Sequence, residues 1–297
     1  MTPTALDAGP DADLATPGLA RRTLAVFARN KLALTGALLL LALLAFCFLG
    51  PLIHPTDQIH TDLSQASRAP GAGHPLGTTD LGYDLLGRLM YGGRTSLEVG
   101  LAAGLLAALF GTVYGAVAGY CGGWADAAMM RITDAALAVP ALFLLVVVAA
   151  IVTPSKPVLI LIIASVAWLS PARLVRGEAL ALRSRDYVHA MRLMGGGGGR
   201  AVFRHILPNA VGTVIVNATF QVADAILYVA YLSFLGLSIP PPAADWGSLL
   251  SAGITYTQVG HWWLIFPPGI AIVLVVAAFN FIGDGLRDAF DVRLKKN

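Results

Sequence analysis

Residues 32–53 read LALTGALLLLALLAFCFLGPLI, twenty-two positions without Asp, Glu, Lys or Arg. A helix needs about 20 apolar residues to cross the hydrocarbon core of a bilayer. The stretch is longer than the apolar part of a secretory signal, and it ends at Gly50-Pro51, a pair that suits a helix end. It predicts a first transmembrane helix that the protein retains.

The composition of the whole chain agrees with a membrane protein. Of its 297 residues 57% are hydrophobic and only 12% are charged, about half of the usual 25% or so. A soluble domain of this size would need more polar groups to cover its surface. The formal net charge of +3 gives no reason to expect a nucleic-acid partner.

Five more apolar segments follow, at residues 99–125, 135–155, 157–172, 210–237 and 266–286. The last two are trimmed from longer apolar stretches, and residues 238–266 between them are expected to form a loop. The reason is that Pro240-Pro241-Pro242, Asp245 and Gly247 suit a helix interior poorly. The predicted fold class is therefore all-α, with six transmembrane helices and both termini on one side.

The distribution of Lys and Arg predicts the orientation. Sixteen of them fall on the side of the N-terminus, and four fall on the other side: Arg68, Arg88, Arg94 and Lys156. Because cytoplasmic loops carry the excess of basic residues, both termini are expected to be cytoplasmic. The expected order is a disordered, basic cytoplasmic tail (1–31), the first helix (32–53), an extracytoplasmic loop (54–95), a five-helix core (96–290) with a cytoplasmic loop at 177–208, and a cytoplasmic tail (291–297).

That cytoplasmic loop has an unusual sequence. Residues 186–195 read DYVHAMRLMG, four more glycines follow, and residues 200–208 read RAVFRHILP. The first part suits a short helix with Asp186 near its N-terminus, and the five glycines would break it, with Gly195 taking a positive φ. Phe203, Ile206 and Leu207 are expected on one face of a second short helix that ends before Pro208. The loop is predicted to be a helix–turn–helix elbow, or else an amphipathic connector resting on the membrane surface.

Asp224 lies inside the fifth predicted helix, where a charge costs a few kcal/mol and normally faces protein or water. It either makes a helix–helix hydrogen bond or lies in a translocation pathway, together with Tyr228 one turn further on. Five residues separate Asp224 from Val229, which puts the two some 140° apart around a helix.

The outer segments carry the remaining polar and aromatic candidates. Asp84 and Arg88 are expected to form an exposed ion pair on a short amphipathic helix, and Glu98 a solvated carboxylate at the start of the second span. Trp246, Trp262 and Trp263 are predicted to be interfacial aromatics. His54, His60, His74 and His261 match no compact set of metal ligands. Cys47 and Cys121 fall near opposite ends of two spans, too far apart for a disulfide.

Sequence features of a catalyst are missing. A phosphate-binding loop needs Gly-Lys-Ser/Thr, and none of the four lysines follows a glycine. No set of nucleophile, base and metal ligands converges either. We expect no catalytic residue, no metal and no cofactor in this chain, and no ATP hydrolysis by it alone.

Several motifs resemble those of one family. The Asp186–Pro208 loop, with Gly195 nine positions after its acidic residue, resembles the EAA loop of binding-protein-dependent ABC importer permeases. HPLGT at 74–78, RHILPN at 204–209, LSFLGL at 232–237 and GDGLRD at 283–288 are similar to the second permease subunit of the dipeptide/oligopeptide subfamily. The chain departs from the pattern at Asp186, Met191, Val229 and Val292, where the family usually has Glu, Ala, Glu and Pro, and in its longer glycine run.

The resemblance implies a type I ABC importer permease fold, located in the inner or plasma membrane, and a role in the ATP-driven import of di- and oligopeptides. It also implies that the loop couples to an ATPase through Asp186, Tyr187, Ala190, Met194, Gly195, Arg204 and Pro208. The implied partners are a second homologous permease, two ATP-binding subunits (or one fused pair) that bind ATP and Mg2+, and an extracytoplasmic substrate-binding protein. Alternatives are an importer of the same type for a nickel chelate or glutathione, and a stand-alone secondary transporter; the latter needs intramembrane ion-coupling groups, and Asp224 is the only carboxylate in the middle of a predicted span.

Overall fold

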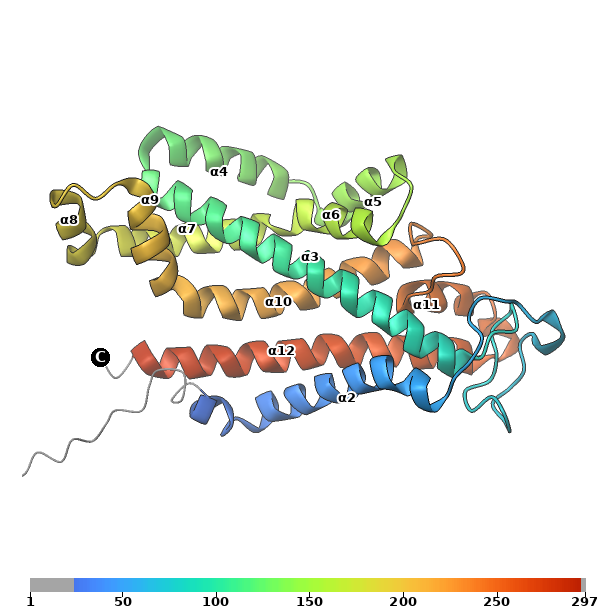
Figure 1. Cartoon of the computed structure of the whole chain (residues 1–297). Coiled ribbons are helices and arrows are strands. Elements are labelled where there is room, and N and C mark those ends of the chain that lie inside the picture. Colours follow the sequence, from blue (N-terminus) through green and yellow to red (C-terminus); the bar gives the residue numbers. More distant parts are fainter. Residues whose placement is uncertain (1–23, 295–297) are drawn as a thin grey trace, which may run out of the picture.

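The computed structural model describes residues 24–294 and is built of helices running along one long axis (Figure 1). Four helices are long and apolar enough to cross a membrane, and there are up to six spans if two bent helix pairs each count as one. The predicted all-α class is confirmed. The expected disordered tail at 1–20, together with Arg21, Arg22, Lys295 and Lys296, lies outside the described residues.

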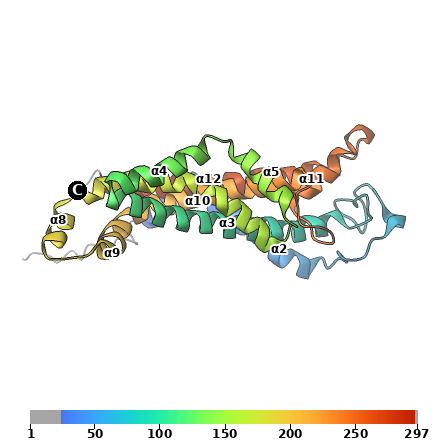
Figure 2. The ribbon, with the colours of Figure 1, turned by 90° about the horizontal axis from the view of Figure 1, so that it is seen from above.

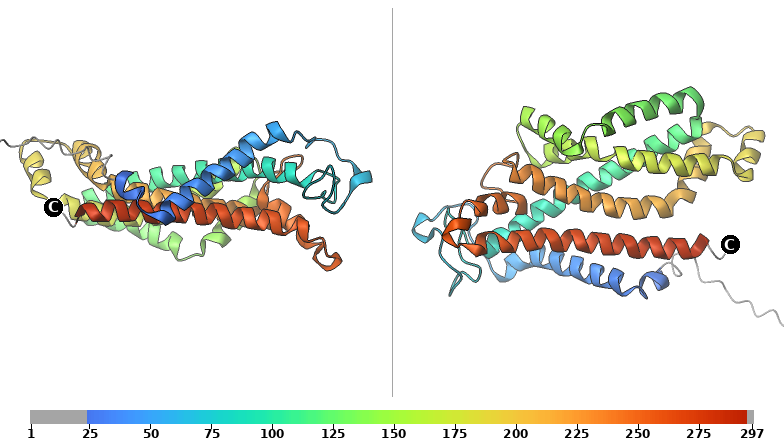
Figure 3. Two further views of the ribbon diagram at one scale, coloured as in Figure 1. Left: turned by 90° about the horizontal axis from the view of Figure 1, so that it is seen from below. Right: turned by 180° about the vertical axis from the view of Figure 1, so that it is seen from behind.

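Helices α2 (Lys31–Ile53) and α12 (Phe266–Leu294) lie side by side along one edge of the molecule (Figures 1 and 3). The side chain of Asn30 accepts hydrogen bonds from the backbone N–H groups of Leu32 and Ala33, and its Nδ2 donates to Asp288 Oδ2 at 3.0 Å. Asn30 therefore caps α2 and ties its start to the last turns of α12.

Helix α3 (Leu85–Cys121) is one uninterrupted helix of 37 residues, which corresponds to about 55 Å at 1.5 Å per residue. The predicted division into a short outer helix and a span beginning at residue 99 is wrong; it rests on Arg94 and Glu98, which interrupt the apolar pattern. Both charges have partners: Arg94 donates to the carbonyls of Cys47 and Phe48, and Glu98 pairs with Lys156 at 2.7 Å.

Glycines on α3 allow two other helices to approach its backbone closely. A Cβ at Gly115 would lie 2.2 Å from the Ala172 carbonyl oxygen of α7 (Leu169–Arg183). One at Gly104 would lie 2.6 Å from the Val222 Cα of α10 (Leu207–Phe234). Small residues at such crossings allow the dispersion contacts that hold membrane helices together.

The third and fourth spans are bent. Helix α4 (Gly123–Leu137) meets α5 (Ala141–Ile151) at 83°, and α6 (Lys156–Ala167) meets α7 at 45°. The structure therefore corrects three predictions: a loop at 126–134, a span at 135–155 and a span ending at 172.

Ion pairs between α4 and α7 satisfy the charged residues of these two helices. Arg176 of α7 donates to both carboxylate oxygens of Asp126 of α4, at 2.6 and 2.7 Å. Arg173 donates to Asp134 at 2.6 Å one turn away. Charges that interrupt the apolar pattern of α4 and α7 therefore join the two helices.

Residues 238–266 are not the predicted loop, since they contain α11 (Trp246–Ile254). Asp245 and Ser248 form a capping box that starts this helix. Trp246 is fully buried, and its Nε1 donates to the Leu89 carbonyl of α3 at 2.9 Å. Trp263 is also buried, so of the three tryptophans predicted to be interfacial only Trp262 is exposed.

The two ends of the molecule differ in content (Figures 1 and 2). One end carries the start of α2, the C-terminal end of α12 and the segment from α8 (Asp186–Leu193) to α9 (Gly198–Ala201). The other end carries residues 54–84 with the short helix η1 (Leu63–Gln65), α11, η3 (Thr257–Val259) and η4 (Trp262–Leu264). We call the first the elbow end and the second the cap end.

Candidate coupling loop and translocation pathway

The elbow is formed by α8, a glycine turn, α9 and the π-helical turn η2 (Val202–Ile206). Gly195 has φ 79° as predicted, its N–H donates to the Arg192 carbonyl, and the N–H of Gly196 donates to the Met191 carbonyl. This is the Schellman arrangement that ends a helix at a left-handed residue. The predicted five-glycine break is too long, because Gly198 and Gly199 already belong to α9.

The elbow is attached to the rest of the protein by a few contacts. Val188 and Met191 are buried, and a Cβ at Gly198 would lie 3.0 Å from Tyr120 Cε1. The guanidinium of Arg192 lies over the Tyr120 ring of α3 at 4.7 Å, a cation–π contact. These contacts fix the direction of α8 relative to the end of α3.

The outer surface of the elbow is apolar and exposed. Leu193, Met194 and Phe203 are 90%, 81% and 61% exposed. The residues implied to couple to an ATPase are all exposed in this chain: Asp186, Tyr187, Ala190, Met194, Gly195, Arg204 and Pro208. A group of large exposed apolar side chains on a short projecting segment marks an interaction surface.

The structure corrects two expectations for the second half of the elbow. Phe203 and Ile206 do not share a face, because the π-helical turn shifts the register; the N–H of Leu207 donates to the Val202 carbonyl, Ile206 is buried and Phe203 is exposed. Pro208 does not end a helix either. It lies in the first turn of α10, where its missing N–H is not needed, and residues Gly198–Phe234 form one continuous span. The exposure of Phe203 was not predicted. The signal that could have indicated it is an apolar residue within an Arg-rich loop.

Asp224 and Tyr228 of α10 line a pocket of about 140 Å³. Its other walls come from both helix bends, through Pro140 between α4 and α5 and Leu169 at the start of α7. Asp224 is exposed and has no hydrogen-bond or ion-pair partner among the described residues. The hydrogen bond that one interpretation required is therefore not found there.

Val229, where the subfamily usually has Glu, points elsewhere. It is buried in the apolar cluster formed by α3, α5, α6 and α10. This agrees with the separation of some 140° expected from helix geometry. Irregular backbone at membrane depth is tolerated where it lines a cavity or is buried in protein. The two helix bends meet this condition because they form walls of the Asp224 pocket.

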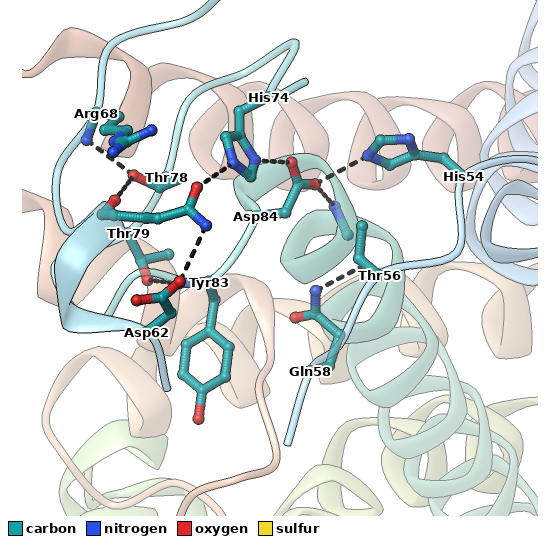
Figure 4. A network of polar contacts seen from close by, with 12 residues as sticks. His54, Thr56, Gln58, Asp62, Arg68, His74, Thr78, Thr79, Tyr83 and Asp84 are labelled. Atoms are coloured by element: carbon teal, nitrogen blue, oxygen red, sulfur yellow. Dashed lines mark hydrogen bonds and ion pairs between the residues drawn. The ribbon is translucent and has the colours of Figure 1, made fainter. Parts of the chain in front are cut away.

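The cap end contains a polar network that the sequence did not predict (Figure 4). Asp84 is buried, caps α3 through the N–H of Gly87, and accepts from His54 Nε2 at 3.2 Å and His74 Nδ1 at 2.8 Å. His74 Nε2 lies 2.7 Å from Gln65 Oε1. The expected exposed pair between Asp84 and Arg88 is therefore wrong, because residues 54–84 fold back over the start of α3 and bury both residues.

The structure also bears on a possible metal site and on the two cysteines. The described residues contain no group of three or more His, Cys, Asp or Glu that could hold a metal ion. Cys47 and Cys121 are free thiols on α2 and at the end of α3.

The fold and the elbow define a class: a multi-pass helical membrane protein that presents a projecting surface for another subunit. Comparison with family models gives the family. Residues 111–296 match the binding-protein-dependent transport system inner membrane component, and residues 18–70 match the N-terminal transmembrane domain of oligopeptide transport permease C. The chain belongs to the family of binding-protein-dependent transport system inner membrane components, as its motifs indicated.

Three relatives agree with this assignment. The chain is 41% identical to the oligopeptide transport system permease protein OppC of Escherichia coli over 89% of this chain and 88% of the relative. It is 38% identical to the dipeptide transport system permease protein DppC of Bacillus subtilis, over 90% and 84%. A putative peptide permease protein of Brucella suis is 42% identical over 95% and 94%. The chain is thus a non-catalytic, multi-pass inner-membrane permease that works in a transporter complex with other subunits.

Proposed function

We propose that this chain pairs with a second homologous permease to form the pathway through which an ATP-driven importer takes up di- and oligopeptides. Two ATP-binding subunits, or one fused pair, bind ATP and Mg2+ and engage the elbow. An extracytoplasmic binding protein delivers the peptide to the cap end. The names of the relatives, which are oligopeptide and dipeptide permeases, support the substrate class.

The observation that carries the proposal is the exposed apolar elbow surface. Leu193, Met194 and Phe203 would be costly to leave in water, and a partner that covers them would remove that cost. The elbow is fixed to α3 through Arg192 and Tyr120, and it leads directly into α10. A push on the elbow would therefore reach the helix that carries Asp224 and Tyr228.

The pocket at Asp224 and Tyr228 is the proposed pathway element of this chain. A carboxylate without an internal partner suits the amino group of a passing peptide, and the phenol of Tyr228 can donate to a peptide carbonyl. The two helix bends that form its walls can open or close without breaking a straight helix. Glutamate at 224 should preserve peptide uptake, whereas alanine should reduce it.

The cytoplasmic location of the elbow and of both termini is part of the proposal. Single cysteines placed at positions 70 and 198, in a background without Cys47 and Cys121, should react with an impermeant thiol reagent from opposite sides of the membrane. Labelling of both from one side would overturn the orientation.

Reconstitution tests the proposal as a whole. The complex with both permeases and the ATP-binding subunits, in vesicles with the binding protein outside, should take up a labelled tripeptide only when ATP and Mg2+ are inside. The isolated chain should show no ATP hydrolysis above background. Uptake by the isolated chain, driven by an ion gradient, would favour a secondary transporter instead.

A further inference from the structure

A second, larger cavity of about 780 Å³ lies at the cap end and shares no lining residue with the Asp224 pocket. Its walls come from residues 79–85 beside the start of α3, residues 153–154 between α5 and α6, residues 236–244 after α10, and α11. This volume is in the range of ligand-binding pockets, about 300–1,000 Å³. A peptide of two to five residues could enter such a space.

Arg88 supplies a buried positive charge to the wall of this cavity. It is only 6% exposed, its guanidinium lies over the Tyr83 ring at 3.6 Å, and its Nη1 donates to the Pro242 carbonyl at 2.6 Å. A guanidinium has five N–H donors. No carboxylate of the described residues forms an ion pair with it.

Two buried carboxylates of the cap end, Asp84 and Asp245, are already engaged elsewhere. Asp84, one turn before Arg88, accepts from His54 and His74 (Figure 4). Asp245 is buried and accepts from the Ser238 hydroxyl and the Ser248 N–H. Burying a cation without an anionic partner costs free energy. The cavity wall therefore lacks a negatively charged group that would stabilise the Arg88 guanidinium.

An independent observation points to a missing ligand. Ser233 is 2% exposed, lines the same cavity, and its Oγ has no hydrogen-bond partner among the described residues. Buried hydroxyls normally have one. Asp80, also on the wall, adds a negative charge to the same space.

We propose that this cap-end cavity binds the carboxylate of an incoming peptide, with Arg88 as the anion-binding residue. A guanidinium suits a carboxylate because it can donate two parallel hydrogen bonds. The Ser233 hydroxyl donates to the same ligand, and Asp80 provides a counter-charge for a peptide amino group. The inference rests on the proposed function, because it takes the solute to be a peptide.

The test measures occupancy of the cavity directly rather than transport. Cysteine replaces Ala252, an exposed residue of the cavity wall, in the full complex without Cys47 and Cys121 and without the binding protein. The rate of its reaction with a maleimide is measured with tri-alanine and with C-terminally amidated tri-alanine. Tri-alanine should slow the reaction, and the amide should need about a tenfold higher concentration to do so.

Variants of Arg88 separate charge from structure. Arg88→Gln should remove the preference for the free carboxylate, whereas Arg88→Lys should keep part of it. Arg94→Gln is the matched control, since Arg94 is also an arginine of the cap end that donates to backbone carbonyls but does not line the cavity, and it should behave like the parent.

Equal protection by tri-alanine and its amide in the parent would overturn the proposal, whether or not the Arg88 variants fold. So would protection in Arg88→Gln with the preference intact. If the full complex imports peptides but the thiol introduced by Ala252→Cys is never protected, only this inference fails. If it imports no peptide at all, the proposed function fails.

Discussion

Both ends of the molecule expose apolar side chains, among them Leu63 and Trp262 at the cap end, but among the described residues only the cap end is held together by a network of buried polar contacts. At the cap end, residues 54–84 fold back so that His54 and His74 both hydrogen-bond to Asp84, and Trp246 is buried with its N–H satisfied. At the elbow end, Leu193, Met194 and Phe203 remain exposed although they are apolar. The polar groups of the cap are largely satisfied within this chain, apart from the wall at Arg88, whereas the elbow presents the apolar surface that the proposed ATP-binding subunits would cover.

The difference lies in how each end is built. The cap uses long-range contacts between residues 54–84, the start of α3 and α11, so many groups hold one another in place. The elbow is a short helix, a glycine turn and a π-helical turn; Val188 and Met191 of the short helix are buried, and Arg192 lies over Tyr120 of α3. A small element of this kind can move as a unit when a partner pushes on it.

The largest effect is expected at Gly195. Gly195→Val forces a β-branched residue into φ 79°, at a cost of roughly 1 kcal/mol or more, and changes the end of α8. We expect stimulated ATP hydrolysis and peptide uptake to fall together by about tenfold, with normal expression and binding-protein docking.

Gly197→Ala is the control for this prediction. Gly197 has an ordinary φ of −73° and open space around its Cβ position, so its effect should be small. If Gly195→Val transports and hydrolyses ATP like the parent, the elbow is a passive connector. The two ends then do not differ in coupling to the ATP-binding subunits.

An exposed leucine at each end sharpens the comparison. Leu193→Asp should weaken the association of the ATP-binding subunits by about tenfold or more, because it places a charge in an apolar contact surface. Leu63→Asp, on an exposed residue of η1 at the cap end, should leave this association unchanged. The amount of ATP-binding subunit that co-purifies with each variant measures the effect; equal recovery would argue against the elbow as the docking surface.

The ion pair between Asp126 and Arg176 should matter for stability rather than coupling. Asp126→Asn removes a buried carboxylate that accepts two hydrogen bonds from Arg176, at a cost of about 2 kcal/mol. Asp134→Asn removes the neighbouring exposed pair and should cost less than about 1 kcal/mol. The thermal unfolding midpoint of the purified complex should fall clearly for the first and barely for the second, and the reverse order would contradict the role of burial.

The smallest effect is expected at the cap. Asp84→Asn keeps a side chain that can cap α3, but it removes the charge that His54 and His74 share, for an expected loss of about 1 kcal/mol. Asp57→Asn, on an exposed turn, is the control and should cost less. Hydrogen exchange of residues 74–88 should rise in the first variant alone; unchanged exchange would show that the network does not stabilise the cap.

Much of the fold could be predicted from the pattern of apolar residues. The segment 32–53 corresponds closely to α2, and the positive φ of Gly195 followed from its place at the end of a short helix. The errors in the helix boundaries share one cause: charged or turn-forming residues were taken to end helices. Arg94, Asp126 and Arg176 lie inside helices because distant residues satisfy their charges, and α11 forms around Gly247 because this glycine lets α11 lie against Ala230 of α10.

The motifs by themselves determined the family, since short strings such as HPLGT and GDGLRD can be read in the linear sequence whatever surrounds them. The apolar spans determined the all-α class, because a bilayer accepts little other than helices in a chain of this composition. The tertiary structure alone decided that His54 and His74 meet on Asp84, that Arg88 is left without a carboxylate in the wall of a cavity, and that Asp224 faces two helix bends. These are contacts between residues far apart in the chain, and hydrophobic periodicity, which reports on neighbours three or four positions away, carries no information about them.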